Sequence, residues 1–104
     1  MSERWRPVVD ADGYEVSDQG RVRSYRKPFT GERLAVAKDL VLRPTSKGYL
    51  RVSIDGRNRF VHRLVLEAFA GSRPSGMQCR HLNGDAADNR LENLSWATAA
   101  GNHA

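Results

Sequence analysis

Residues 49–70 read YLRVSIDGRNRFVHRLVLEAFA, and this stretch decides the fold. Residues 49–54 and 59–61 are short runs suited to β-strands, and Asp55-Gly56-Arg57-Asn58 separates them. An Asp-Gly pair supplies the positive φ angles that tight hairpin turns require. We therefore expect a β-hairpin whose turn spans residues 55–58.

The second half of the stretch has the period of an amphipathic helix over residues 62–70. Its apolar residues recur at the spacing of one helical stripe, and they are Val61, Leu64, Val65, Ala68 and Phe69. Gly71 and then Pro74 end the helix. A chain of 104 residues has few other side chains from which to build an interior. The stripe is therefore expected to be core.

On the C-terminal side of the helix, residues 78–82 are expected to form a short strand, followed by a polar loop of turn-forming residues over 83–89. Apolar residues then bring the chain back to the core at Leu91, Leu94 and Trp96. Thr98 is a candidate N-cap for a short closing helix over 99–103. Cys79, Trp5 and Trp96 are expected to be core residues.

On the N-terminal side, residues 6–9, 14–16 and 21–25 are short apolar-rich runs separated by turn signals, so they predict a small meander of strands. Residues 21–25 alternate charged and apolar side chains. One face of that strand is expected to pack on Trp5 or Tyr14, and its arginines to face water or phosphate. Residues 26–39 are polar and without a clear period, which predicts a loop or linker, and residues 40–43 predict one more strand, ended by Pro44.

Composition limits the class of protein. The 104 residues suffice for one domain, and a single cysteine excludes an intramolecular disulfide, a CxxC zinc site and a thiol redox pair. The apolar runs are far shorter than a membrane span or the apolar core of a signal peptide. We therefore expect no membrane role and a cytoplasmic location, in a bacterial or phage-infected host cell.

The positive charge is concentrated in the middle of the chain. The net charge is +5 and the isoelectric point is about 10.0. Residues 21–59 carry eleven basic and three acidic side chains, while residues 1–20 are net acidic and 61–104 are balanced. Such an excess favours a polyanionic partner. The expected DNA contacts are Arg21, Arg23, Arg26, Lys27, Arg51, Arg57, Arg59, His62 and Arg63. A structural role for His62 is the alternative to a contact with the DNA backbone.

The most informative motif begins at His81. It reads His81-Leu82-Asn83-Gly84-Asp85, then Asp88-Asn89-Arg90-Leu91-Glu92-Asn93-Leu94-Ser95-Trp96, then Thr98 and Asn102. This pattern resembles the HNH endonucleases, also called ββα-metal or His-Me finger nucleases, in the form found in phage and group I intron homing enzymes. The resemblance implies an α+β fold in which a small N-terminal β module precedes a β-hairpin, a helix and the ββα-metal nuclease motif.

Three stretches nearer the N-terminus are similar to the NUMOD-like, nuclease-associated DNA-binding module that often precedes such nucleases. They are Trp5-Arg6-Pro7-Val8, Gly13-Tyr14-Glu15-Val16-Ser17 and Gly20-Arg21-Val22-Arg23-Ser24. We therefore divide the chain into a basic DNA-binding module over 1–45 and an HNH endonuclease domain over 46–104. The implied partner is double-stranded DNA, bound by a monomer or a homodimer, and the implied activity is hydrolysis of phosphodiester bonds by nicking or by cutting both strands.

The residues of the motif suit this chemistry. Phosphodiester hydrolysis needs a base for water and a cation that neutralises charge in the transition state. His81 suits the first task as a general base. The amide oxygen of Asn102 suits the second, because it is a hard ligand appropriate to Mg²⁺ or Mn²⁺. The resemblance assigns the same roles to these two positions, and it gives Asn93 a structural role, in which its side chain bonds across the loop and holds His81 in place.

One position departs from the family pattern. The residue before the catalytic His often holds an Asp or Asn that shares the metal, and here it is Arg80. A guanidinium cannot ligate a cation, so the metal rests on Asn102, phosphate and water alone or recruits Asp85. As an alternative role, Arg80 clamps the scissile phosphate.

Two other readings compete with the nuclease. In the first, a degenerate HNH site leaves a non-catalytic DNA-binding module. In the second, a structural zinc site would use Cys79, His81, His62 and His103, but their spacing matches no recognised finger, and no zinc is expected.

Overall fold

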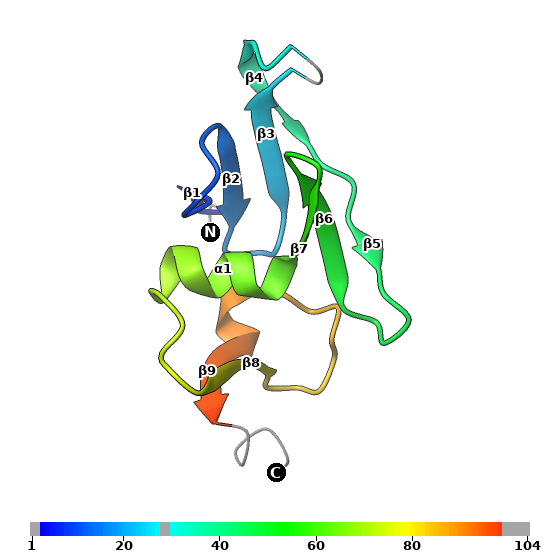
Figure 1. Cartoon of the computed structure of the whole chain (residues 1–104). Helices are drawn as coiled ribbons and strands as arrows, with labels where there is room; N and C mark the ends of the chain where they lie inside the picture. Colours follow the sequence, from blue (N-terminus) through cyan, green and yellow to red (C-terminus); the bar gives the residue numbers. More distant parts are fainter. Residues whose placement is uncertain (1–2, 28–29, 99–104) are drawn as a thin grey trace.

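One helix, α1 (Val61–Phe69), lies across the middle of the molecule (Figure 1). The computed structural model describes residues 3–27 and 30–98. Within these residues α1 contacts strands from both the N-terminal and the C-terminal part of the chain. The α+β architecture expected from the motif resemblance is therefore confirmed, with several small sheets arranged around one helix.

The first sheet is an antiparallel meander. Its strands are β1 (Trp5–Pro7), β2 (Tyr14–Ser17), β3 (Val22–Arg26) and β4 (Arg33–Asp39), and they are adjacent in this order. Val16 of β2 and Val22 of β3 form a Cα pair and are almost completely buried. The predicted meander is thus present, although its first strand begins and ends earlier than residues 6–9.

The second sheet contains the predicted hairpin. It consists of β5 (Arg43–Pro44), β6 (Leu50–Ile54) and β7 (Arg57–Phe60). The turn is shorter than the four residues expected, because Asp55 and Gly56 both have positive φ angles, 51° and 78°, and reverse the chain by themselves. Arg57 is therefore already paired with Ile54.

The helix follows the hairpin directly and begins at Val61, one residue before the predicted start. Val61, Leu64 and Val65 of the expected stripe are buried, and Ala68 and Phe69 pack against them. Leu66 is buried as well, because α1 is covered on more than one side. The core is one continuous cluster, which runs from Val8, Val16 and Val22 through Val52 and Ile54 to Leu94.

The third sheet is a two-stranded ribbon of β8 (Met77–His81) and β9 (Leu94–Thr98). A polar loop and the 3₁₀ turn η1 (Leu91–Asn93) connect the strands. Cys79 and Trp96 are partly buried and pack against the core, close to what the sequence predicted. The expected closing helix over 99–103 lies outside the described residues.

Two predictions for residues 26–43 were wrong. Residues 33–39 form the strand β4 rather than a loop, because β4 is an edge strand held by pairing with β3 and has no fully buried face to give it an alternating pattern. The strand expected over 40–43 is displaced to Arg43–Pro44. Leu40 instead bonds through its backbone N–H to the Val22 carbonyl while the chain crosses to the second sheet.

The packing of Trp5 also differs from the expectation. Val22 and Ser24 of β3 are buried, but Trp5 is only partly buried and is not part of the core cluster. The Arg23 guanidinium lies 3.9 Å from the centre of the Trp5 ring, so the charged face of β3, not its apolar face, covers this residue.

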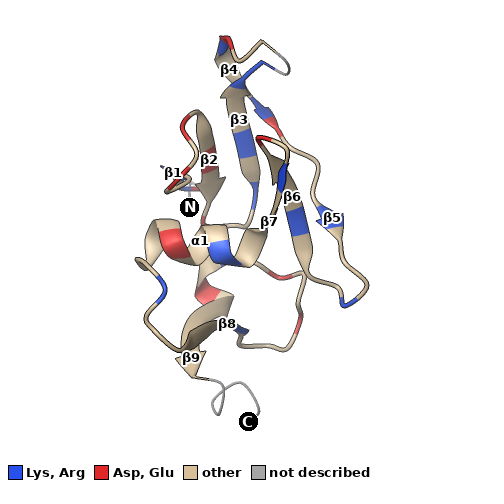
Figure 2. Cartoon of the chain, in the orientation of Figure 1, with Lys and Arg blue, Asp and Glu red and all other residues tan. Residues whose placement is uncertain are grey.

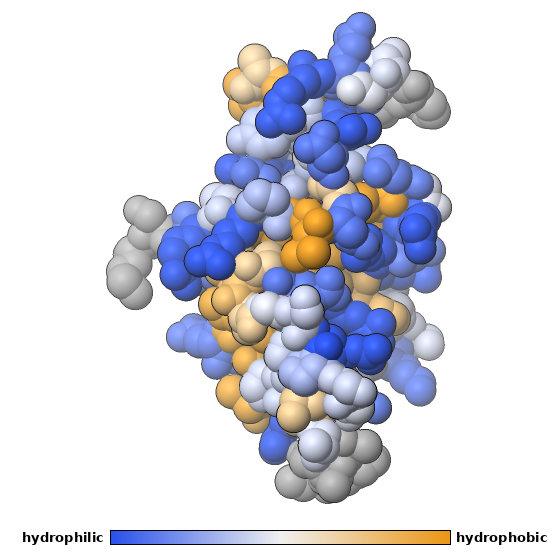
Figure 3. All heavy atoms as spheres, turned by 60° about the vertical axis from the view of Figure 1, so that its left-hand side comes forward, coloured by the Kyte–Doolittle hydropathy of each residue, from blue (hydrophilic) through white to orange (hydrophobic). Residues whose placement is uncertain are grey.

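One face of the molecule shows how charged and apolar side chains are distributed on the surface. On the face shown in Figure 3, apolar side chains form small patches between charged and polar ones. Among the residues that the structure describes, no helix is both long and apolar enough to cross a membrane.

Candidate active site

His81 is the last residue of β8 and lies between the polar loop and the N-terminal turn of α1. Its Nε2 is 2.8 Å from Oδ1 of Asn89. An amide oxygen only accepts hydrogen bonds, so Nε2 donates the proton and the lone pair of the neutral ring resides on Nδ1. Nδ1 forms no hydrogen bond with any of the described residues. The ring therefore presents a basic nitrogen.

An aromatic cluster surrounds the His81 ring on the side of α1. The His62 ring is 5.2 Å from the His81 ring at an interplanar angle of 72°, and the Tyr49 ring is 5.9 Å from it. His62 also stacks on Phe60 at 5.3 Å. These ring contacts restrict the orientation of the His81 ring, in addition to its hydrogen bond with Asn89.

His62 itself is 7% exposed, and its Nδ1 has no hydrogen-bond partner among the described residues. Burial, and to a smaller extent the neighbouring His81 and Arg63, together lower the pKa of His62 from 6.5 to about 4. His62 is therefore neutral at pH 7. This burial favours the structural role over a direct contact with the DNA backbone.

Asn93 connects the two sides of the polar loop. Its Nδ2 donates to Oδ1 of Asn83 at 2.9 Å and to the backbone carbonyl of Asp88 at 2.9 Å, and its Oδ1 accepts from the Asn83 backbone N–H at 3.0 Å. The Asn93 carbonyl accepts from the Leu82 N–H at 2.8 Å. A buried side chain therefore closes the loop immediately after His81.

The carboxylates of this loop are engaged within it. Asp88 accepts two hydrogen bonds at 2.8 Å from the Arg90 guanidinium, which holds the pKa of that carboxyl well below its usual range. Asp85 is exposed and accepts a hydrogen bond from the Ala87 backbone N–H at 3.0 Å. Within residues 3–27 and 30–98, no three His, Cys, Asp or Glu side chains come together in a group that fits a metal ion.

Arg80 precedes His81 in β8 and pairs with Ser95 of β9. Arg80 is partly buried, and its guanidinium has no ion pair or hydrogen bond with the described part of the chain. The predicted metal ligand Asn102, and His103 of the zinc alternative, lie outside the described residues.

The basic residues expected to contact DNA divide into two groups. In the first group the charge is already paired: Arg21 with Glu3 and Asp39, Arg23 with Glu15, Arg26 with Asp12, Lys27 with Glu32, and Arg59 with Asp10. The closest of these contacts is 2.7 Å. The first sheet therefore neutralises much of its own positive charge.

In the second group the charge has no acidic partner among the described residues, and it comprises Arg51, Arg57 and Arg63. Arg51 lies directly opposite Arg43 on β5 and opposite Phe60 on β7, so these side chains share one face of the second sheet. The Arg63 guanidinium lies 5.7 Å from the Phe60 ring. We call Arg43, Arg51, Phe60 and Arg63 the arginine row.

The arginine row leads toward His81. Tyr49, which contacts the His81 ring, precedes β6 by one residue and so shares a face with Arg51. Figure 2 shows basic residues on β5, β6 and α1 at this side of the molecule. Like charges directly opposite each other destabilise a sheet unless an anion lies between them. The arrangement of Arg43 and Arg51 therefore suits a phosphate.

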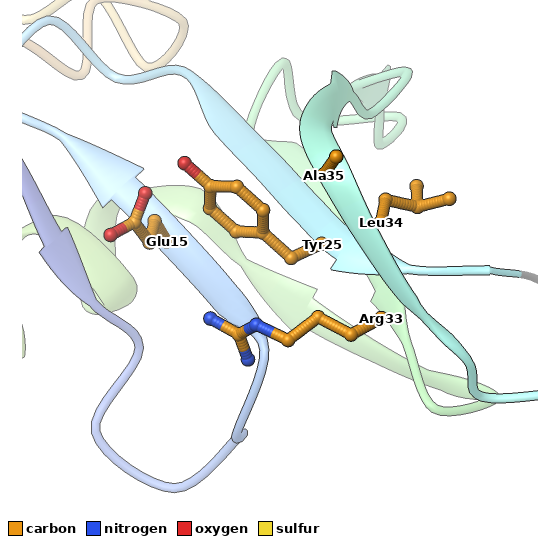
Figure 4. A pocket seen from close by; sticks show the side chains of 5 residues that line it. All are labelled: Glu15, Tyr25, Arg33, Leu34 and Ala35. Atoms are coloured by element: carbon orange, nitrogen blue, oxygen red, sulfur yellow. The ribbon is translucent and has the colours of Figure 1, made fainter.

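A separate shallow pocket of about 580 Å³ lies on the first sheet and is lined by Glu15, Tyr25, Arg33, Leu34 and Ala35. Tyr25 and Arg33 both extend toward Glu15 in it (Figure 4). The Arg33 guanidinium is 5.4 Å from the Tyr25 ring. The pocket is lined by residues of β2, β3 and β4, and none of the residues around His81 lines it.

Sequence reasoning did not single out Asn89 or Arg43. Asn89 lies within the quoted motif, but its role depends on a contact eight residues away that no local pattern reveals. Arg43 was counted among the basic residues, and only the strand register places it opposite Arg51.

Two family models match the chain over nearly all of its length. The N-terminal match is to the NUMOD4 motif over residues 3–55, and the C-terminal match is to the HNH endonuclease model over residues 59–104. Among curated proteins, two uncharacterized HNH endonucleases of Acanthamoeba polyphaga mimivirus are similar, at 32% identity over 97% of this chain and at 27% identity over 92%.

The similarity extends to a solved structure, which describes DNA binding and cleavage by the HNH homing endonuclease I-HmuI. The two chains share a TM-score of 0.75 and 28% sequence identity over 96% of this chain. This chain spans 25% and 27% of the lengths of the two mimivirus relatives and 55% of the I-HmuI chain.

Proposed function

Because this chain belongs to the HNH endonuclease family and carries a NUMOD4 motif, we propose that it is a metal-dependent DNA endonuclease that hydrolyses phosphodiester bonds, by nicking or by cutting both strands. The observation that carries the proposal is the 2.8 Å contact between His81 and Asn89 beside the unpaired arginine row. This part of the molecule therefore places a ring nitrogen that has a free lone pair next to a surface suited to phosphate. The cytoplasm of a bacterial or phage-infected cell remains the expected compartment.

In this proposal His81 is the general base. Its Nδ1 takes a proton from the attacking water, and the bond from Nε2 to Asn89 keeps the ring in the tautomer that this step requires. Asn93 contributes by closing the loop behind His81, as its three side-chain hydrogen bonds indicate. Neither residue needs to bind DNA tightly for this role.

HNH nucleases generally depend on a divalent metal, and we propose Mg²⁺ or Mn²⁺ for this chain. The ligands would be Asn102, DNA phosphate and water, with Asp85 as a further candidate. The bound cation would neutralise charge at the scissile phosphate and the leaving oxygen. The Arg80 guanidinium has no hydrogen bond or ion pair with the described residues, which supports a role as a clamp on the same phosphate.

We propose that double-stranded DNA lies across the arginine row, with its backbone near His81. Arg43, Arg51 and Arg63 would contact phosphates, because no carboxylate among the described residues neutralises them. Arg57 lies in the same hairpin and also lacks an acidic partner among the described residues, but its pairing with Ile54 places it on the opposite face of the sheet from Arg51. The basic residues of β3 and Arg59 would contribute less, since each of them already has an acidic partner.

A non-catalytic DNA-binding module is the second candidate. The observation that favours it is Arg80, which stands where an oxygen ligand is common in the family. The two candidates share the same DNA-binding surface. They differ in whether the backbone is cut.

The deciding experiment is cleavage of supercoiled plasmid DNA with Mg²⁺, with Mn²⁺ and with EDTA. We expect nicked or linear product with either metal and none with EDTA. His81→Ala is expected to lower the cleavage rate by about 10² to 10⁴, because general-base catalysis is lost, while DNA affinity stays close to that of the wild type. Absence of cleavage at every metal concentration would favour the non-catalytic module, and a His81→Ala protein that cuts normally would exclude His81 as the base.

A further inference from the structure

The turn between β2 and β3, residues 18–21, contacts the segment that connects β8 and β9 and follows His81 in the chain. The Leu91 backbone N–H donates to the Asp18 carbonyl at 2.8 Å. Asp18 is in turn fixed by Arg4, whose backbone N–H and Nε donate to its carboxylate, each at 3.1 Å. The N-terminal module therefore touches the nuclease motif two residues after Asn89.

Gly20 brings the same turn against Asn89 itself. A β-carbon added to Gly20 would lie 3.0 Å from Cβ of Asn89 and 3.1 to 3.2 Å from its carbonyl oxygen and carbon. Gly20 has a φ of 86°, a conformation that other residues rarely adopt. Glycine is thus required at position 20 for two independent reasons: its positive φ angle, and the short distance between its backbone and Asn89.

Asn89 is the residue that the turn supports, and its burial makes it a precise partner for His81. The residue is 3% exposed, and its Nδ2 is buried without a hydrogen-bond partner among the described residues. The unpaired amide N–H is a cost of this arrangement, and the hydrogen bond between Oδ1 and the His81 ring is the side-chain bond that orients the Asn89 amide among the described residues. A side chain held in this way fixes the ring orientation and the tautomer of its partner.

We propose that the N-terminal module is a structural part of the active site: the turn over residues 18–21 positions Asn89, and Asn89 keeps His81 protonated on Nε2 so that Nδ1 is the base. Asn89 is a positioning residue, and Gly20 acts through it. This inference rests on the proposed function of His81. It gives the module a second role beside DNA binding.

The test measures the tautomer of His81 directly and the cleavage rate separately. Long-range ¹H–¹⁵N spectra of the ¹⁵N-labelled chain report which ring nitrogen carries the proton. The variants are Asn89→Leu, which keeps the branched shape of the side chain but removes the acceptor, and Asn89→Asp, which keeps an acceptor. For the turn, Gly20→Ala is compared with Gly56→Ala, because Gly56 also has a positive φ but has no heavy atom within 4 Å of an added β-carbon.

We expect the wild-type ring to be protonated on Nε2. Asn89→Leu should lose this preference and reduce the single-turnover cleavage rate by roughly 100-fold, since misplacement of a catalytic group by about 1 Å has that effect. Its DNA affinity should stay within about twofold of the wild type, and Asn89→Asp should restore both the tautomer and most of the rate. Gly20→Ala should lower the rate well below that of Gly56→Ala.

A wild-type ring protonated on Nδ1, or an Asn89→Leu protein with normal tautomer and rate, would overturn the role of Asn89. Equal rates for the two glycine variants would overturn the role of the turn. A wild-type chain that never cuts DNA would instead refute the proposed function, and the spectra of the same protein would still decide whether Asn89 sets the tautomer.

Discussion

Arg80 is the single residue that most affects how this site would hold a metal. With a guanidinium before His81, a cation would bind weakly to the free protein and more tightly once a DNA phosphate completes its ligand shell. We expect Arg80→Asp to lower the Mg²⁺ concentration needed for half-maximal cleavage, because it restores a carboxylate, and Asn102→Ala to raise it. Titrating Mg²⁺ into the three proteins, with and without a slowly cleaved phosphorothioate duplex, measures both effects. Tight Mg²⁺ binding without DNA would show that other residues hold the metal, and Asp85 would be the first candidate to test.

His62 should make the stability of the fold depend on pH. Its pKa is 6.5 in the unfolded chain and about 4 in the folded protein, mainly because the ring is buried. As pH falls below 6.5, His62 binds a proton in the unfolded state but stays neutral in the folded state. The free energy of unfolding therefore decreases until pH reaches about 4 and then levels off. The loss is at most about 3 kcal/mol.

Urea unfolding at several pH values between 7.5 and 4 measures this loss. His62→Phe, whose ring suits a site already stacked on Phe60, should show a shallower decline than the wild type. Identical slopes for the two proteins would mean that His62 titrates normally in the fold.

At the scale of secondary-structure elements, the two sheets should contribute unequally to DNA binding. Replacing Arg43 and Arg51 with Gln should flatten the slope of log affinity against log salt by roughly two units, since each lost phosphate contact removes about one. The matched variant replaces Arg21 and Arg23, which lie in ion pairs with Glu3, Asp39 and Glu15, and its slope should change little. Fluorescence anisotropy with a labelled duplex at four or more salt concentrations provides both slopes. The opposite ranking would place the DNA on the first sheet.

The elements that the sequence predicted well have local causes. The hairpin follows from the Asp55-Gly56 turn, and α1 follows from a helical stripe that ends before Gly71. The elements it missed depend on distant partners: β4 exists because β3 lies beside it, and Trp5 is covered by Arg23 rather than by the core. The motif located His81 and Asn93, whereas the support given to Asn89 by Gly20 appears only when residues 69 positions apart are brought together by folding.

On the scale of the whole molecule, one core joins the two parts of the chain, so they should unfold together. Buried residues of the first sheet, α1 and β9 belong to the same cluster. The two tryptophans report on different ends, since Trp5 lies in β1 and Trp96 in β9. Trp5→Phe and Trp96→Phe each leave one reporter, and within either protein the fluorescence transition should coincide with the loss of far-ultraviolet circular dichroism. Separate midpoints would show that the N-terminal module unfolds independently.

The outer edge of β4 has a consequence for how the protein behaves at high concentration. As the last strand of its sheet, β4 leaves one row of backbone N–H and C=O groups without a neighbouring strand, and Val36 on it is 79% exposed. Such an edge is a template on which a second polypeptide can add a strand and start aggregation. Here Arg33, Lys38 and Asp39 place charges near both ends of the strand, and the irregular register between Ser24 and Arg26 interrupts its pairing with β3. The charges of β4 thus oppose the addition of a further strand at this edge, which is a reason for their presence that requires no contact with DNA.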